Sequence, residues 1–135
     1  MPAERGFIDT NILVYNQTDD DPGKALKTET VIVPGNVISV QVLNELTNVL
    51  VRKARWPWEA VRESLMLTRA ILDVVPLTEA IHEDGLRLAE RYSLSIYDAM
   101  IVAAALDSGC DVLWSEDMQH DLRVDGRLRI RNPFL

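Results

Sequence analysis

The stretch Gly6-Phe7-Ile8-Asp9-Thr10-Asn11 places a short apolar run directly before a carboxylate. Such a run is typical of a short buried strand, so Asp9 would stand at the strand's carboxyl end. Ligands of open α/β sheets bind beyond the carboxyl ends of the strands. The residues after every other apolar run are therefore of interest, and those runs are Asn36-Val37-Ile38, Val74-Val75, Val112-Leu113-Trp114 and Leu128-Arg129-Ile130-Arg131.

Helical patterns separate these runs. Apolar residues recur at steps of three and four between Val42 and Leu50, and again between Val61 and Leu72. Residues 18–34 form an acidic turn and then a weakly patterned helix from Lys24 to about Ile32. Two further helices follow candidate N-caps. Thr78 would cap the first, whose inner face carries Ile81, Leu86 and Ala89. Ser95 would cap the second, with Asp98 as the capping-box acid and Gly109 as the residue that ends the helix.

Strands that alternate with helices predict an α/β fold with a mainly parallel central sheet and helices on both faces. We expect about four or five strands in one domain that spans residues 1–135, because no repeat or long linker divides the chain.

Composition narrows the class of protein. The chain has 135 residues, 47% of them hydrophobic, and its longest apolar run, Ala99 to Leu106, is far shorter than the ~20 residues of a membrane span. The start of the chain lacks the apolar core of a secretory signal. A single cysteine, Cys110, excludes an internal disulfide and indicates a reducing compartment, so we expect a cytoplasmic protein.

Four carboxylates, far apart in the sequence, lie close to one edge of the predicted sheet. Asp9 and Asp117 follow apolar runs, Glu45 lies on the helix after Ser39, and Asp98 lies in the first turn of the helix before Val112. They can therefore converge on one edge of the sheet, where a hard cation such as Mg²⁺ or Mn²⁺ would offset their repulsion. Each also has a simpler interpretation, as a cap, a solvated helix residue or a turn former. The net charge of −7 disfavours binding to nucleic-acid phosphates. A metal that neutralised these acids would remove much of that objection.

Several blocks of the sequence resemble the PIN-domain family, in the family's order along nearly the whole chain. They are Phe7-Ile8-Asp9-Thr10-Asn11-Ile12-Leu13-Val14-Tyr15, Ile38-Ser39-Val40-Gln41-Val42-Leu43-Asn44-Glu45, Tyr97-Asp98-Ala99-Met100-Ile101-Val102-Ala103-Ala104-Ala105, Ser115-Glu116-Asp117-Met118-Gln119-His120 and the ending Asn132-Pro133-Phe134. The length is similar to that of VapC-like toxins of type II toxin–antitoxin pairs.

The resemblance implies a Mg²⁺- or Mn²⁺-dependent endoribonuclease that hydrolyses RNA phosphodiester bonds. It implies a catalytic set of Asp9, Glu45, Asp98 and Asp117, with Asp9, Asp98 and Asp117 as metal ligands. Asn11 and Ser115 match polar positions that support the site through hydrogen bonds. The implied partners are an RNA substrate, a cognate antitoxin protein and a second copy of the chain in a homodimer.

Basic residues offer a candidate RNA contact. Arg52, Lys53 and Arg55 end the helix that carries Glu45, and Trp56 follows them. Cations also favour the C-terminus of any helix, so the cluster has a purely structural interpretation as well.

Three other classes of protein share some of these features. A haloacid-dehalogenase-type phosphatase needs a second Asp where Asn11 stands, and a response-regulator receiver needs a Lys that has no counterpart after the fifth strand. The remaining alternative is a catalytically inactive PIN-like scaffold that binds RNA or protein, although all four acids of the family are present.

Overall fold

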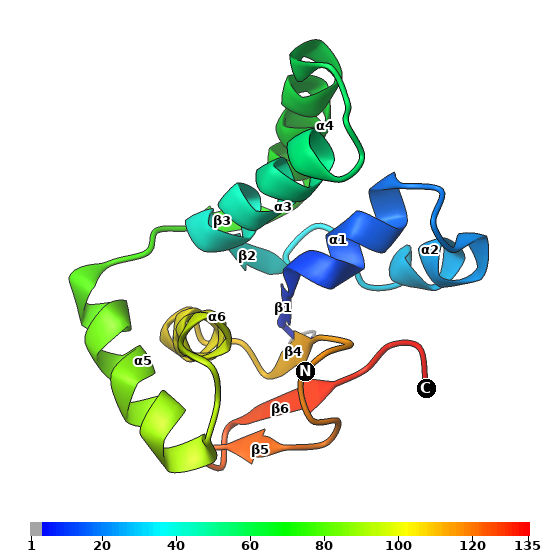
Figure 1. The fold of residues 1–135 in the computed structure, drawn as a ribbon. Coiled ribbons are helices and arrows are strands. Elements are labelled where there is room, and N and C mark those ends of the chain that lie inside the picture. The colour runs from blue at the N-terminus through cyan, green and yellow to red at the C-terminus, as the bar shows by residue number, and fades with distance from the viewer. Residues whose placement is uncertain (1–3) are drawn as a thin grey trace.

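The computed structural model describes residues 4–135 and shows an α/β fold built on one sheet (Figure 1). Its strand order is β3-β2-β1-β4-β6-β5, and every neighbouring pair is parallel except β5 with β6. The predicted α/β class with a mainly parallel sheet is therefore confirmed. The six strands are β1 (Gly6–Ile8), β2 (Val37–Ser39), β3 (Asp73–Val75), β4 (Val112–Trp114), β5 (Arg123–Val124) and β6 (Leu128–Arg131).

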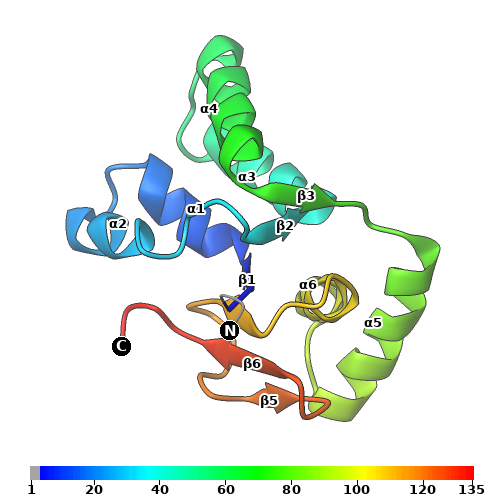
Figure 2. The same ribbon diagram turned by 180° about the vertical axis from the view of Figure 1, so that it is seen from behind.

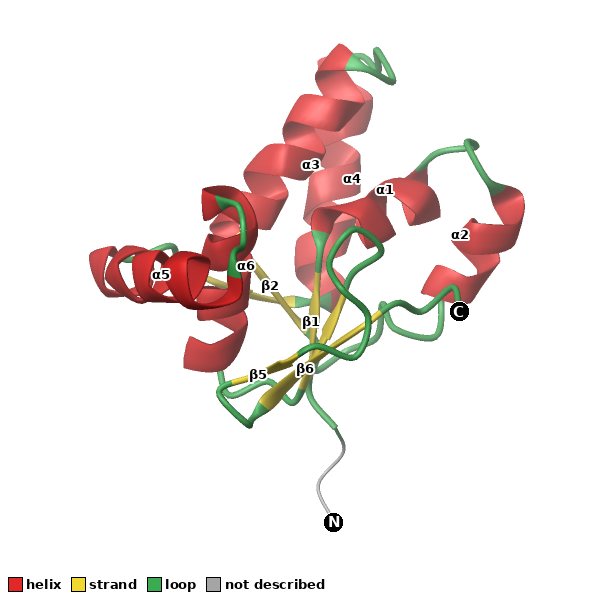
Figure 3. Cartoon of the chain, turned by 60° about the horizontal axis from the view of Figure 1, so that its bottom comes forward, coloured by secondary structure: helices red, strands yellow, loops and turns green. Residues whose placement is uncertain are grey.

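Helices enclose this sheet from several sides. The α1–α2 pair and the α5–α6 pair flank it, and α3 and α4 extend from the β2–β3 side (Figures 2 and 3). The six helices are α1 (Thr10–Gln17), α2 (Pro22–Thr28), α3 (Val40–Arg52), α4 (Trp58–Ile71), α5 (Glu79–Tyr92) and α6 (Ile96–Asp107).

The centre of the core is formed by the inner strands and α6. Phe7, Ile8 and Leu113 are completely buried, as β1 and β4 lie side by side in the middle of the sheet. All residues of α6 from Ala99 to Leu106 are buried, because this helix packs against α5 and also contacts β2 and β4. A helix that is apolar all round is stable only in such an enclosed place.

Side-chain caps decide where most helices begin. Ser39, Thr78 and Ser95 each accept a hydrogen bond from the backbone N–H three residues later. Asp9 and Asp21 cap α1 and α2 with their carboxylates. A cap of this kind satisfies a backbone donor that the helix itself leaves free. The caps predicted from the sequence at Ser39, Thr78 and Ser95 are confirmed.

The fold differs from the sequence-based expectation in four details. The sheet has a sixth strand, because the two-residue β5 pairs antiparallel with β6. The helix α1 has no counterpart among the predicted helices, and α2 spans Pro22–Thr28 and ends well before Ile32. On α5, Leu86 is 44% exposed and Leu88 takes the inner position that the pattern gave to Leu86.

Among residues 4–135, no helix combines the length and apolar character needed to cross a membrane.

Asn36 ties the start of β1 to the turn before β2. Its Oδ1 accepts from the Gly6 N–H at 2.9 Å, and its Nδ2 donates to the Val31 carbonyl at 2.7 Å. The side chain is buried, so its removal leaves two backbone groups without partners and without water.

We predict that Asn36→Ala lowers the free energy of unfolding by about 2–4 kcal/mol, because each unsatisfied buried group costs roughly 1–3 kcal/mol. Urea unfolding measures the change. Asn44→Ala, at an exposed position of α3, is the control and should stay within about 0.5 kcal/mol of the wild type. Equal stability of the two variants would show that the Asn36 bridge does not stabilise the sheet.

Candidate active site

Asp9, Glu45, Asp98 and Asp117 form what we call the acidic edge of the molecule. Asp9 is the most buried of these four carboxylates, at 5% exposure. It follows β1 directly and caps α1, with Oδ1 accepting from the Thr10 N–H at 2.7 Å. Its Oδ2 accepts from Ser115 Oγ at 2.7 Å and from Asn11 Nδ2 at 3.3 Å. Burial raises the pKa of Asp9 from its ordinary 3.8 to about 6, against the lowering effect of the Ser115 and Thr10 hydrogen bonds. The charges of Asp98 and Glu45 make a smaller contribution to the same increase.

Asn11 joins two acids that come from different parts of the chain. Its Nδ2 donates to Asp117 Oδ2 at 3.0 Å as well as to Asp9, and its Oδ1 accepts from the Glu116 N–H at 3.3 Å. The last contact fixes the orientation of the amide group, so that the NH₂ group faces the two carboxylates. Asn11 and Ser115 therefore both hold acidic side chains through hydrogen bonds, and their support of a catalytic site stays a prediction.

Glu45 reaches the same region from the middle of α3. Its Oε1 accepts from Thr10 Oγ1 at 2.5 Å, and its Oε2 accepts from Gln41 Nε2 at 3.4 Å. Gln41 also donates to the Tyr97 carbonyl at 3.0 Å. Thr10 thus donates to one acid from its backbone and to another from its side chain.

Asp98 and Asp117 complete the acidic group. Asp98 lies in the first turn of α6, with its N–H donating to Ser95 Oγ at 3.2 Å, and Asp117 lies exposed in the loop after β4. Burial raises the pKa of Asp98, a contact with Ser95 lowers it, and the charges of Asp117 and Glu45 raise it. Asp98 is therefore within electrostatic reach of two other acids.

One pocket of about 850 Å³ is lined by all four predicted acids. The parallel arrangement explains why, since the carboxyl ends of β1 and β4 meet at one edge, where the first turn of α6 and the middle of α3 also arrive. The structure thus brings together Asp9, Glu45, Asp98 and Asp117, with Asn11 beside them. Their catalytic role is a separate question and stays a prediction.

The three basic candidates differ in their placement. Lys53 lines the acidic pocket, whereas Arg52 and Arg55 are exposed and do not line it. Trp56 lines the pocket as well and packs partly against the core. Of the basic cluster, Lys53 alone stands where a phosphate could approach the acids.

Glu116 and His120, both close to Asp117 in sequence, have structural contacts of their own. Glu116 forms an ion pair with Lys24, and His120 Nδ1 accepts from the Asn132 N–H at 3.0 Å. Partial burial raises the pKa of Glu116, but the hydrogen bonds from Lys24 and Tyr15 outweigh it and hold that pKa below its usual value. Glu116 still lines the pocket, on the side that faces α2.

Sequence reasoning missed Thr10 and Gln41 as supports of Glu45. Thr10 lies inside the block that begins with Phe7, and Gln41 lies one helical turn before Glu45, so a helical i, i+4 pairing could have indicated the second contact. The Thr10–Glu45 contact joins two distant elements and has no local signal.

The donor set determines which metals this pocket could hold. Only carboxylate, amide and hydroxyl oxygens are on hand, and such oxygens suit hard cations such as Mg²⁺ and Mn²⁺. Within residues 4–135, however, no three His, Cys, Asp or Glu side chains form a group that could hold an ion on their own. Mg²⁺ usually binds proteins through one or two carboxylates and keeps several waters, so the spread of the acids is compatible with it.

Comparison with known proteins decides the family. Residues 6–123 match the PIN domain. The chain belongs to the PIN-domain family. Among curated proteins, none matches this PIN domain in sequence.

Solved structures share the fold of this PIN domain over nearly its whole length. A toxin–antitoxin complex from Klebsiella pneumoniae is 20% identical with a TM-score of 0.73, and the match covers 95% of this chain and 97% of that one. VapBC2 from Rickettsia felis, bound to a promoter DNA fragment, is 18% identical with a TM-score of 0.69 and coverages of 95% and 98%. VapC20 from Mycobacterium tuberculosis, a toxin that cleaves the sarcin–ricin loop, is 19% identical with a TM-score of 0.64 and coverages of 83% and 89%.

The raised pKa of Asp9 predicts how the stability of this PIN domain depends on pH in the absence of metal. Folded Asp9 binds its proton more tightly than the unfolded chain does, so its contribution is greatest below the unfolded pKa of 3.8. That contribution is lost as the pH rises through the folded pKa of about 6. The loss is on the order of 2–3 kcal/mol.

Asp9→Asn removes this titration while keeping the size of the side chain. We therefore expect the unfolding free energy of the wild type, relative to Asp9→Asn, to fall between about pH 4 and pH 6 in EDTA. Urea unfolding at a series of pH values gives the difference. A difference that rises with pH would contradict the burial of a charged Asp9.

Proposed function

We propose that this PIN domain is a metal-dependent endoribonuclease and the toxin of a toxin–antitoxin pair. The observation that carries the proposal is the convergence of Asp9, Glu45, Asp98 and Asp117 on one open pocket. Carboxylates that lie this close together repel one another, so such a group is unusual unless a cation binds among them.

One or two of the carboxylates of Asp9, Asp98 and Asp117 would hold the ion together with waters, and Glu45 stands beside them on α3. A bound Mg²⁺ or Mn²⁺ would lower the pKa of a coordinated water and stabilise charge on a phosphodiester oxygen. Asn11 and Ser115 keep Asp9 and Asp117 in place through their hydrogen bonds. Thr10 and Gln41 hold Glu45 in the same way.

The direction of substrate entry follows from the charges at the rim. Lys53 lines the pocket on the α3 side, so a phosphate could pair with its ammonium group while the neighbouring phosphodiester lies near the acids. The solved relatives support RNA as the substrate, because VapC20 cleaves the sarcin–ricin loop. An RNA substrate is met in the cytoplasm, where a single thiol such as Cys110 stays reduced.

An antitoxin is the proposed protein partner, since relatives of the same fold occur in toxin–antitoxin complexes. An acidic pocket can receive an Arg side chain, whose guanidinium pairs with carboxylates through two hydrogen bonds. Such a contact would block both the metal and the RNA. Homodimerisation stays an expectation, and sedimentation of the isolated chain tests it.

Asp98→Asn is the variant that tests the function. It removes one ligand charge, so we expect RNA cleavage to fall by about 100-fold and the Mg²⁺-induced rise in melting temperature to shrink. Without metal the variant should melt higher than the wild type, because a carboxylate next to Asp117 and Glu45 is removed. Cleavage of labelled RNA and melting curves in EDTA and in Mg²⁺ provide the measurements.

Asp107→Asn is the matched control, because Asp107 is an exposed acid at the far end of the same helix. It should retain wild-type cleavage and a wild-type Mg²⁺ response. If folded Asp98→Asn cleaved RNA as fast as the wild type, the metal-site assignment would be wrong. A wild type that binds RNA without cleaving it in Mg²⁺ or Mn²⁺ would favour the scaffold alternative.

The partner has a separate test. The protein encoded beside this chain's gene, co-purified with it, should suppress RNA cleavage, and excess Mg²⁺ should restore part of the activity by competing for the carboxylates. A stable complex that cleaves RNA at the full rate would contradict inhibition at the acidic pocket.

A further inference from the structure

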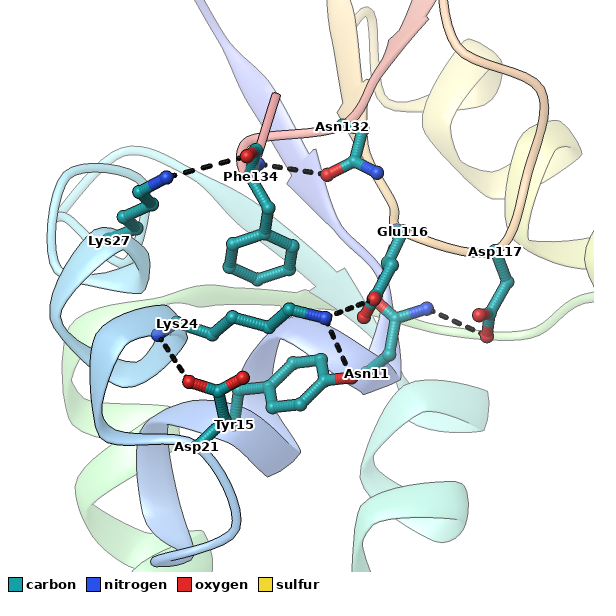
Figure 4. Close-up of polar contacts among 9 residues, drawn as sticks. All are labelled: Asn11, Tyr15, Asp21, Lys24, Lys27, Glu116, Asp117, Asn132 and Phe134. Carbon is teal, nitrogen blue, oxygen red and sulfur yellow. Dashed lines mark hydrogen bonds and ion pairs between the residues drawn. The ribbon is translucent and has the colours of Figure 1, made fainter.

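Lys24 of α2 lies where several distant segments meet. Its ammonium group donates to Glu116 Oε1 and, at 3.4 Å, to the Tyr15 hydroxyl. It also lies 4.7 Å from the centre of the Tyr15 ring and 5.2 Å from the centre of the Phe134 ring. Figure 4 shows the side chain running between the two rings towards Glu116. The ion pair is half-buried, with the Lys24 side chain 31% exposed and the Glu116 side chain 24% exposed.

The C-terminal residues close one side of this contact. The Phe134 ring meets the Tyr15 ring edge-on, with 5.3 Å between centroids and an 82° interplanar angle. Asn132 Oδ1 accepts from the Phe134 N–H at 2.8 Å, and the Asn132 N–H donates to His120. The aromatic rings shield the ammonium from part of the solvent, which strengthens its attraction to the carboxylate.

Glu116 connects Lys24 to the acidic pocket. It stands between Ser115, which donates to Asp9, and Asp117, which accepts from Asn11. Its own N–H donates to Asn11 Oδ1 and thereby orients the amide that holds both acids. In Figure 4 the Glu116 carboxylate meets the Lys24 ammonium, and the Asp117 carboxylate meets the Asn11 amide. The place of Glu116 therefore affects the geometry of its neighbours on both sides.

We propose that Lys24 is a positioning residue for the acidic pocket, acting through Glu116. Its ion pair anchors the loop of residues 115–117, so that Asn11 can hold Asp117 beside Asp9 in the arrangement that receives a cation. The pair also keeps the Glu116 carboxylate occupied. The consequence for catalysis rests on the proposed function, whereas the anchoring of the loop does not.

An unpaired Glu116 would change the site in two ways. It would add a free carboxylate to a pocket that six other acids already line, and it would release the loop from α2. The free carboxylate would compete with Asp9 and Asp117 for the cation, and the released loop would no longer hold Asp117 beside Asp9. An isolated ion pair at a surface contributes little to stability, so the effect should be seen in metal affinity and turnover more than in melting temperature.

Lys24→Met tests the proposal, because Met keeps the apolar length of the side chain and lacks the charge. Lys27→Met is the matched control on the same helix, since Lys27 donates to the Phe134 carbonyl and makes no contact with Glu116. Lys24→Arg keeps the charge and should rescue the wild-type behaviour. The measurements are amide hydrogen exchange at Glu116 and Met118, the Mg²⁺ concentration at half-maximal thermal shift, and kcat and KM on a labelled RNA oligonucleotide.

We expect Lys24→Met to speed exchange at Glu116 and Met118, whose N–H groups donate to Asn11 and Ser115. We expect the Mg²⁺ midpoint to rise and kcat to fall by about 10-fold each, with KM unchanged. Lys27→Met and Lys24→Arg should stay close to the wild type in every measurement.

Three results would overturn the proposal. Unchanged exchange and an unchanged Mg²⁺ midpoint would show that Lys24 does not hold the loop. A raised KM with unchanged kcat would make Lys24 a phosphate contact, and a lower melting temperature alone would make it a purely structural residue. Failure of the proposed function looks different, because the wild type would then cleave no RNA, while hydrogen exchange would still report on the loop.

Discussion

Mutual repulsion of carboxylates is the constraint on which the rest of this structure depends. The chain holds its acidic edge together with neutral donors, and no Lys or Arg among residues 4–135 forms an ion pair with Asp9, Glu45, Asp98 or Asp117. A single amide, that of Asn11, donates to two acids. Hydroxyl and amide groups position carboxylates without cancelling their charge, so the negative potential that attracts a cation is preserved.

The fold determines where the four acids lie. Parallel strands β1 and β4 end at the same edge, and α1 and α6 begin close to it, so the acids stand on elements whose positions the buried core determines. The Lys24–Glu116 pair adds a charged anchor at one side of the pocket, where it does not neutralise the acids themselves. The stability of the core is thus used to hold an arrangement that is unfavourable by itself.

The sequence predicts features that depend on residues close together in the chain better than contacts between distant elements. Apolar runs such as Gly6-Phe7-Ile8 indicate strands because burial on both faces requires them, and Thr78 and Ser95 indicate helix starts because caps act locally. Helix α1 was missed because it lacks a clear apolar stripe, and β5 because two residues carry no pattern. The convergence of the acids could be predicted from topology, but the Thr10–Glu45 and Lys24–Glu116 contacts depend on side-chain packing between distant elements.

A crystal soaked in Mn²⁺ shows whether the acidic edge receives a divalent cation. Anomalous scattering locates the metal independently of any assay of activity. We predict an anomalous peak in the pocket, coordinated by carboxylate oxygens of Asp9, Asp98 or Asp117 with water completing the shell. A pocket without a peak at saturating Mn²⁺, in a crystal whose pocket is open to solvent, would show that the acidic edge does not bind a divalent cation.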